Sequence, residues 1–170
     1  MPKSTAETNQ QIAYKLSNNL GRILKEFAKD FEHRVLQTLH EQGHHQVRPS
    51  HSAVFSNLGM GAVRVTELAE RARVTQQAMG KMLKELERIG YIVRDLDGQD
   101  KRAKEIRFTP MGVQLVRDSM VAVDAVRQEY ADKIGRDELN QLESLLRPAV
   151  NKIDLDYLPE SWVNAGNIGE

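Results

Sequence analysis

The chain has 170 residues, of which 40% are hydrophobic, and its basic and acidic residues are equal in number. This length suits one folding unit with long helices and is short for two enzyme domains. Cysteine is absent, which excludes disulfides, thiolate catalysis and cysteine-ligated zinc. With no long apolar stretch and no signal-peptide core, the chain is expected to be cytoplasmic and to have no membrane partner.

The charges are distributed unevenly along the chain. Residues 64–107 hold eleven basic and eight acidic residues, whereas residues 130–170 hold four basic and eight acidic ones. A net charge of zero argues against nucleic-acid binding, because phosphate contacts usually come from a basic surface. The basic middle segment keeps that function open, although ordinary surface variation explains the asymmetry equally well.

A long amphipathic helix is predicted from about residue 7 to residue 42, because apolar residues recur there in steps of three and four. Gly43 is expected to end it. At 1.5 Å per residue this helix is roughly 50 Å long, too long for a small domain to cover, so it is expected to pack against a partner. After a loop, Ser50 is expected to cap a short helix over residues 53–58.

A helix-turn-helix is predicted over residues 66–89, after a short strand at 63–65. Thr66 is expected to cap its first helix and Thr75 its second, which ends at Gly90. The inward positions expected in the second helix are Ala78, Met79, Met82, Leu83, Leu86 and Ile89.

Beyond Gly90 the apolar period changes to two, which predicts a β-hairpin wing over residues 91–108 with its turn at 97–100. Basic residues lie at or beside its tip. Because a minor groove attracts long cationic side chains, this tip is expected to contact DNA.

Two further helices are predicted in the C-terminal part. Thr109 followed by a proline opens the first, and Gly135 ends it. Pro148 is expected to kink or restart the second. The tail carries Trp162, the only tryptophan, and is expected to be extended.

A helix-turn-helix reads bases with the outward face of its second helix. Glutamine can pair with adenine, lysine with guanine or phosphate, and glycine lets the backbone approach closely. A merely solvated helix face is the alternative. The candidate DNA-binding residues on this helix and on the wing are Thr75, Gln76, Gln77, Gly80, Lys81, Lys84, Lys101, Arg102 and Lys104.

Several motifs, in order, resemble the multiple-antibiotic-resistance regulator (MarR) family over about residues 50–115. They are Leu68-Ala69, Val74 to Met79, Leu86 to Arg94, Asp97-x-x-Asp100-x-Arg102 and Ile106-x-Phe108-Thr109-x-x-Gly112. The resemblance implies a mainly α fold with a small β-hairpin wing. It places a winged helix-turn-helix at 49–109, dimerisation helices at 1–48 and 110–154, and a tail at 155–170.

The resemblance also implies a homodimeric, sequence-specific DNA-binding transcriptional regulator on a pseudo-palindromic operator. Such a regulator is usually a repressor, released when a small effector, often aromatic and anionic, binds between the dimer helices and the winged domain. By position, Asp100 orders the wing and Arg102 enters the minor groove. Gln99, Lys101 and Phe108 depart from residues frequent in the family, so weaker DNA binding by the wing is expected.

All five histidines lie between His33 and His51. A metal-responsive regulator is one interpretation, with His40, His44 and His45 as candidate ligands, but zinc or nickel needs three or four ligands. Solvated or capping histidines are the simpler interpretation, and no cofactor is expected. His40 and His51 are also candidate effector-pocket residues that hydrogen-bond an anionic ligand.

Catalysis finds little support in the sequence. No nucleophile elbow or glycine-rich phosphate loop occurs, and the carboxylates mostly have the spacing of helix-surface charge pairs. A regulator is therefore expected and not an enzyme. A winged helix that binds only protein remains as the other alternative.

Overall fold

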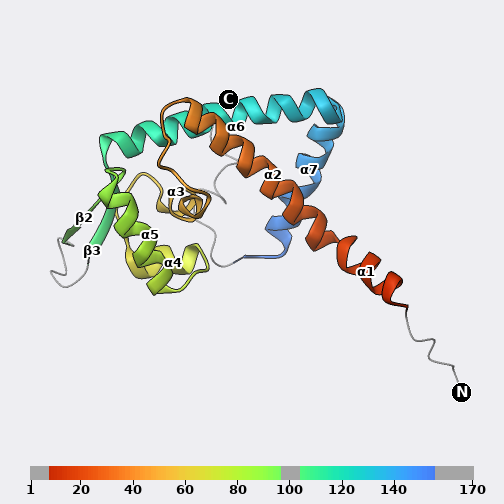
Figure 1. Cartoon of the computed structure of the whole chain (residues 1–170), viewed down its shortest axis with the longest axis horizontal. Helices are drawn as coiled ribbons and strands as arrows, with labels where there is room; N and C mark the ends of the chain where they lie inside the picture. Colours follow the sequence, from red (N-terminus) through yellow and green to blue (C-terminus); the bar gives the residue numbers. More distant parts are fainter. Residues whose placement is uncertain (1–7, 97–103, 156–170) are drawn as a thin grey trace, which may run out of the picture.

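The structure, a computed structural model, describes residues 8–96 and 104–155. The chain is mainly helical with a small antiparallel sheet, as predicted (Figure 1). Among the described residues, no helix is long and apolar enough to cross a membrane. The elements are α1 (Asn9–Ser17), α2 (Leu20–Glu41), the 3-10 turn η1 (Pro49–His51), α3 (Ser52–Leu58), β1 (Val63–Arg64), α4 (Val65–Arg71), α5 (Gln76–Arg88), β2 (Ile92–Leu96), β3 (Lys104–Phe108), α6 (Pro110–Ile134) and α7 (Arg136–Lys152).

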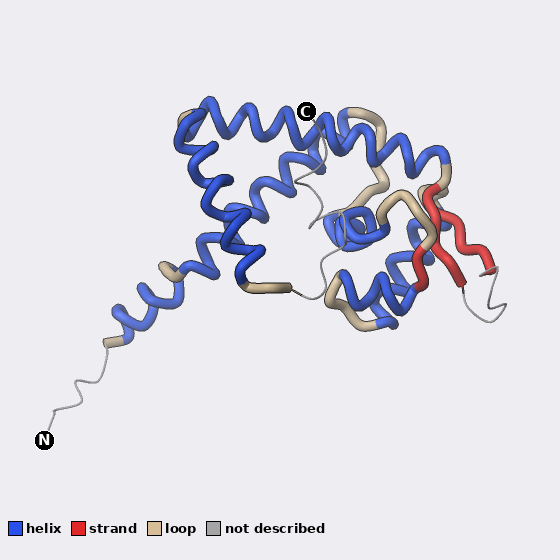
Figure 2. Tube along the Cα trace, turned by 180° about the vertical axis from the view of Figure 1, so that it is seen from behind, coloured by secondary structure: helices blue, strands red, loops and turns tan. Residues whose placement is uncertain are grey.

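The elements form two parts that α6 connects. We call η1, α3, α4, α5 and the sheet the winged part, and α1, α2, α6 and α7 the helical part. In Figures 1 and 2 the sheet lies at one end of α6 and α7 turns back from its other end, while α2 packs along α6 and α1 projects away. The winged part is therefore fixed to the start of a long helix.

The first helical segment is two helices, and the prediction of one continuous helix was wrong. Asn18 ends α1, and its side chain donates to the carbonyl of Tyr14. Asn19 then caps α2 by accepting a hydrogen bond from the Arg22 amide at 3.0 Å. Asparagine side chains compete in this way for backbone groups, so the two break the helix although the apolar spacing continues.

The winged part and the first turns of α6 share a core of fully buried side chains. These are Val54, Leu58, Leu68, Met79, Leu83, Leu86, Ile92, Ile106 and Leu115. Helix α5 contributes the stripe of Met79, Leu83 and Leu86, whose spacings of three and four face one side of a helix. Thr75 caps it as predicted, accepting from the Ala78 amide at 3.1 Å.

Three sequence predictions of helix boundaries need correction. Helix α4 begins at Val65 with Arg64 as its cap, so Thr66 lies inside the helix, because Val63–Arg64 pairs with β3 and fixes the entry. Ser50 lies within η1, in which the buried His51 accepts a hydrogen bond from the Arg48 amide, and α3 begins at Ser52. Pro148 does not restart α7, since it lies near the end of that helix and removes only one hydrogen bond.

The sheet has the order β1-β3-β2 and is antiparallel. Ile92 pairs with Phe108 at the base of the β2-β3 hairpin, and Val63 of β1 pairs with Ile106. The short strand and the hairpin were both predicted. The predicted turn at 97–100 and the Trp162 tail lie outside the described residues.

Candidate nucleic-acid interface and adjoining cavity

Helix α5 presents a polar face to solvent. Because Met79, Leu83 and Leu86 anchor the opposite face in the core, the orientation of this polar face is fixed. Ala78 was predicted to point inward but is exposed, since buried packing in α5 begins one residue later. The exposed residues on and beside this helix are Thr75, Gln76, Gln77, Ala78, Lys81, Lys84 and Arg88.

Gly80 lies on the same helix without a close neighbour. A Cβ at this position meets no atom within 4 Å, so the backbone there is open to the approach of a large partner. Of the predicted wing contacts, Asp100, Lys101 and Arg102 lie outside the described residues, and Lys104 begins β3. Their roles stay predictions.

The wing is tied to α5 by an ion pair that the sequence analysis missed. Arg94 of β2 donates through Nε to Glu87 Oε2 at 2.8 Å, and a second guanidinium nitrogen binds the same oxygen. Glu87 and Arg94 are both in the motif that resembles the MarR family, but seven residues separate them and the turn at Gly90 brings them together.

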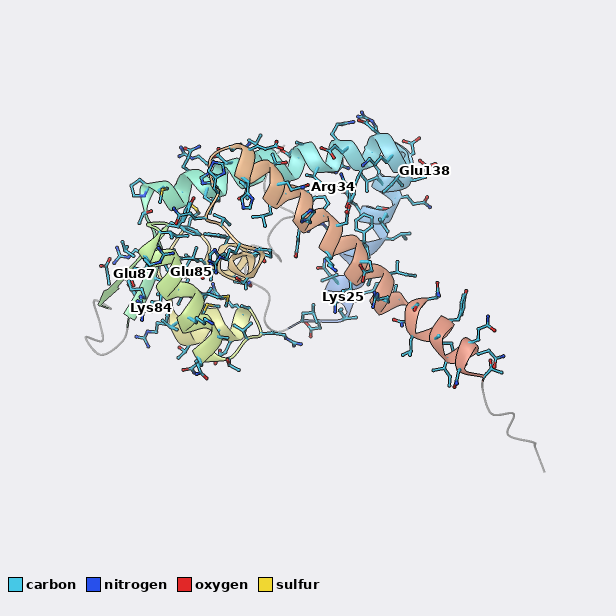
Figure 3. The ribbon with its side chains drawn as sticks, in the orientation of Figure 1. Lys25, Arg34, Lys84, Glu85, Glu87 and Glu138 are labelled. Atoms are coloured by element: carbon cyan, nitrogen blue, oxygen red, sulfur yellow. The ribbon has the colours of Figure 1, made fainter. Side chains whose placement is uncertain are left out.

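Glu85 of α5, labelled in Figure 3, contacts Arg48, the residue that precedes η1, and His51, the last residue of η1. Arg48 Nη1 lies 3.0 Å from Glu85 Oε1, and His51 Nε2 lies 3.3 Å from Oε2. His51 is fully buried, and its Nδ1 accepts from the Arg48 amide, so its Nε2 carries the proton donated to Glu85. The hydrogen bond from His51 and then the charge of Arg48 lower the pKa of Glu85, which keeps this carboxylate ionised at neutral pH.

His44 is buried in a second polar cluster. Its Nδ1 lies 2.8 Å from the Tyr91 hydroxyl and its Nε2 lies 2.9 Å from Asp118 Oδ2. Burial raises the pKa of Tyr91, so the hydroxyl stays protonated. The hydrogen bond from His44, more than that from Gln114, lowers the pKa of Asp118. The cluster joins the loop after α2, the start of the sheet and α6.

The histidine contacts give the metal-responsive alternative no support. Both ring nitrogens of His44 and of His51 have protein partners, and His40 Nε2 donates to the carbonyl of Val47 at 2.8 Å. Within residues 8–96 and 104–155, no three histidine or carboxylate side chains are arranged to hold a metal ion. At His44 and His51, a metal would have to displace hydrogen bonds that the fold uses.

A cavity of about 700 Å³ lies between α2, α6 and the segment 47–56. His33 lines it, whereas His40 and His51, the predicted pocket residues, do not. His40 hydrogen-bonds to the Val47 carbonyl and His51 to Glu85, so both side chains lie behind the cavity wall, within the protein. The apolar lining residues are Phe31, Val35, Leu36, Leu39, Val47, Pro49, Phe55, Val116, Met120 and Val123, and the polar ones are Lys29, Glu32, His33, Arg48, Ser52, Ser56, Ser119 and Asp124.

The sequence profile of the MarR family matches residues 45–103, which include η1, α3, α4, α5 and β2. This chain carries a MarR-family domain. The predicted family resemblance is therefore confirmed.

Solved structures share the fold beyond the MarR-family domain. Apo MarR from E. coli is 21% identical, with a TM-score of 0.66 over 78% of this chain and 97% of that chain. The transcriptional repressor CouR, bound to a 23-mer DNA duplex, is 23% identical, with a TM-score of 0.65 over 80% and 95%. CouR from Rhodococcus jostii RHA1 bound to p-coumaroyl-CoA is 26% identical, with a TM-score of 0.59 over 78% and 92%. CouR is a transcriptional repressor, which agrees with the regulator expected from the sequence.

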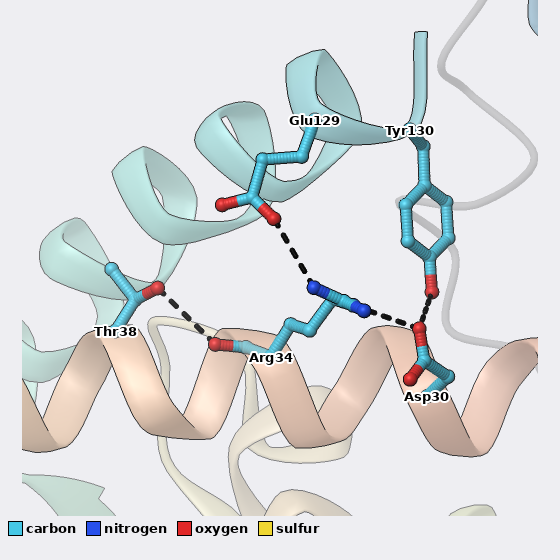
Figure 4. Close-up of polar contacts among 5 residues, drawn as sticks. All are labelled: Asp30, Arg34, Thr38, Glu129 and Tyr130. Carbon is cyan, nitrogen blue, oxygen red and sulfur yellow. Dashed lines mark hydrogen bonds and ion pairs between the residues drawn. The ribbon is translucent and has the colours of Figure 1, made fainter. Parts of the chain in front are cut away.

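Polar contacts hold α2 against α6 beside the MarR-family domain (Figure 4). Arg34 Nε donates to Asp30 at 2.8 Å, and its Nη1 lies 3.4 Å from Glu129 of α6. The Tyr130 hydroxyl donates to the same Asp30 oxygen at 2.5 Å, and this bond, ahead of that from Arg34, lowers the pKa of Asp30. The packing of α2 against α6, which together form two walls of the cavity, is thus held by Arg34 and Tyr130, which both bind Asp30, and by the contact of Arg34 with Glu129.

The helical part exposes many large apolar side chains. On α1 and α2 they follow the apolar stripe that predicted the amphipathic helix, and a partner is expected to cover this stripe. The exposed apolar residues of the helical part are Ile12, Tyr14, Leu16, Leu20, Ile23, Leu24, Phe27, Met111, Met120, Val121, Val123, Ile134, Leu145 and Leu146.

Proposed function

We propose that this protein is a homodimeric, sequence-specific DNA-binding transcriptional regulator, acting as a repressor that a small ligand releases. One observation carries the proposal: α5 is anchored by buried Met79, Leu83 and Leu86 and exposes glutamines and lysines on its other face, inside a MarR-family domain. Such a face suits the major groove. The structure of CouR on a DNA duplex supports this use of the fold.

Different parts of the chain have different proposed roles. Residues 49–109 bind DNA, residues 1–48 and 110–154 form the dimer, and the tail is separate. Gln76, Gln77, Gly80 and Lys81 face bases, Lys84 faces phosphate, and the wing reaches the minor groove. Association of two helical parts is supported by their exposed apolar side chains, which a second copy can bury.

The cavity is proposed as the effector site in place of a site around His40 and His51. Its size is typical of ligand pockets, and its mostly apolar wall with a few charged groups suits an aromatic molecule that carries an anion. It adjoins the MarR-family domain through the segment 47–56. CouR, a relative of the same fold, binds p-coumaroyl-CoA, which supports ligand control here.

A titration of labelled DNA from immediately upstream of this gene tests the proposal. The full chain is expected to shift it saturably, with an affinity that falls as salt rises, and to bind an unrelated duplex of equal length far more weakly. Arg102→Ala is expected to weaken specific binding by about 1–3 kcal/mol. A protein-interaction module would give no saturable shift, and a metal-responsive regulator would change DNA affinity when zinc or nickel is added.

A further inference from the structure

The segment 47–56 has two functional sides. One side, which includes Val47, Arg48 and Phe55, forms a wall of the cavity. From the other side, His51 reaches Glu85 of α5 and Val54 is buried in the core of the winged part. The segment 47–56 therefore connects the cavity wall directly to α5, the helix proposed to read DNA.

Arg48 belongs to both sides. It lines the cavity, and its guanidinium lies 3.0 Å from Glu85 Oε1. The side chain of Arg48 is 65% exposed, and ion pairs in so much water contribute little stability. Glu85 does not depend on Arg48 for its position, because buried His51 holds its other oxygen. The Arg48–Glu85 contact is therefore exchangeable, whereas the His51–Glu85 contact is built in.

We propose that an anionic group on a ligand in the cavity competes with Glu85 for the Arg48 guanidinium, which makes Arg48 the residue through which ligand occupancy acts on α5. This inference rests on the proposed use of the cavity as a ligand site. The ligand class is an apolar, ring-containing body with one carboxylate, sulfonate or similar anion. A planar guanidinium binds such groups in a bidentate geometry, and the apolar wall removes water around them.

Loss of Arg48 changes the electrostatics of the DNA-facing helix. Glu85 lies four residues from Lys81 and three from Arg88, which places all three on neighbouring turns of one helix. When Arg48 no longer pairs with it, the ionised Glu85 carboxylate repels the DNA phosphates. It also attracts Lys81 and Arg88, which are then less available to contact those phosphates. Ligand binding and DNA binding then oppose each other, and the opposition is reciprocal.

A pair of fluorescent probes tests the competition without DNA. The probe 1-anilinonaphthalene-8-sulfonate and its uncharged parent N-phenyl-1-naphthylamine share their rings and differ by one sulfonate. Arg48→Gln is expected to weaken binding of the sulfonate about tenfold and leave the uncharged probe unchanged. Glu85→Gln is expected to strengthen sulfonate binding about two- to fivefold, and this gain is expected to vanish in the Arg48→Gln background.

Matched variants assign the effect to this pair and to this cavity. Arg22→Gln removes the cation of an exposed Arg–Glu pair on α2, and Glu87→Gln removes the neighbouring carboxylate of α5; neither residue lines the cavity, and neither change is expected to alter probe binding. Ser119→Trp, or Met120→Trp at a more exposed lining position, fills the cavity and is expected to abolish binding of both probes.

The inference is overturned if wild type binds neither probe, if Arg48→Gln weakens both probes equally, if Glu85→Gln leaves sulfonate affinity unchanged, or if both tryptophan variants bind normally. If the wild-type protein shows the competition but binds no DNA, the proposed function is wrong and the Arg48–Glu85 exchange remains supported. If it binds DNA without showing the competition, the exchange is wrong and the proposed function remains supported.

Discussion

His44 Nε2 and Asp118 Oδ2 lie 2.9 Å apart and connect the loop after α2 to α6. His44 also reaches the Tyr91 hydroxyl, at the point where α5 gives way to the sheet. His44 and Tyr91 are buried, so the cluster is a polar joint between the helical part and the winged part. Polar groups buried in this way are stable only while each has its partner.

The joint predicts a pH dependence of stability. The hydrogen bond from His44 lowers the pKa of Asp118 below its unfolded value, so the carboxylate stabilises the fold above about pH 4 and this contribution disappears as pH falls through the lower, folded pKa. Asp118→Asn is expected to lower the free energy of unfolding at pH 7, and the difference from wild type is expected to shrink below about pH 4. Urea unfolding of both proteins at pH 7 and below about pH 4 measures this difference in the free energy of unfolding.

Asp132→Asn is the matched control for this prediction. Asp132 also lies on α6 and accepts from a glutamine four residues before it, as Asp118 does, but it is exposed and is bonded to Gln128. Its replacement is expected to have little effect at either pH. Equal losses in the two variants would show that His44 adds nothing to the stability of the joint.

Gly112 predicts a steric requirement at the junction of sheet and α6. A Cβ there would stand 2.1 Å from the Tyr91 carbonyl oxygen, which itself accepts the Thr109 amide. Gly112→Ala is therefore expected to destabilise the fold by about 1–3 kcal/mol in thermal or urea unfolding. Gly80→Ala, with open space around it on α5, is expected to stabilise by up to about 1 kcal/mol and to weaken DNA binding. Equal effects of the two changes would refute this reading of Gly112.

Local capping chemistry explains which parts of the fold could be predicted from the sequence. Thr75 at the start of α5, Gly90 after it and Thr109 before α6 act on backbone groups within a few residues, so their types reveal the boundaries. Asn18 and Asn19 act equally locally, but the apolar stripe runs through them and masks the break.

The polar clusters could not be predicted because their partners are distant in the chain. Tyr91 and Asp118 lie 47 and 74 residues from His44. The histidine-rich window indicated that these residues had a role, but spacing alone could not separate metal ligands from buried hydrogen-bonding groups. Arg48 carried no signal at all, since its importance comes from a cavity wall and a helix that meet only in the folded chain.

Lys84 predicts a change in the salt dependence of DNA binding. It is exposed on α5, whereas Lys25 lies on α2, in the other part of the molecule (Figure 3). Lys84→Ala is expected to reduce the slope of log affinity against log salt by about one, because one phosphate contact is lost. Lys25→Ala removes the same charge and is expected to leave the slope unchanged. If both variants change the slope alike, the effect is one of net charge, and α5 is not the contact surface.

Ile23 predicts how the helical parts associate. Its side chain is 60% exposed on the apolar stripe of α2, and burying such a side chain contributes about 1.5–3 kcal/mol. Ile23→Asp is therefore expected to raise the dimer dissociation constant at least tenfold in sedimentation equilibrium. Met60→Asp is the control, since Met60 is as exposed, at 68%, but lies in the winged part.

Because two recognition helices bind a palindrome only when both subunits are joined, the Ile23 variant is also expected to bind a single half-site as wild type does and the full operator far more weakly. A monomeric wild type, or an Ile23 variant that keeps the dimer intact, would place the interface away from this stripe.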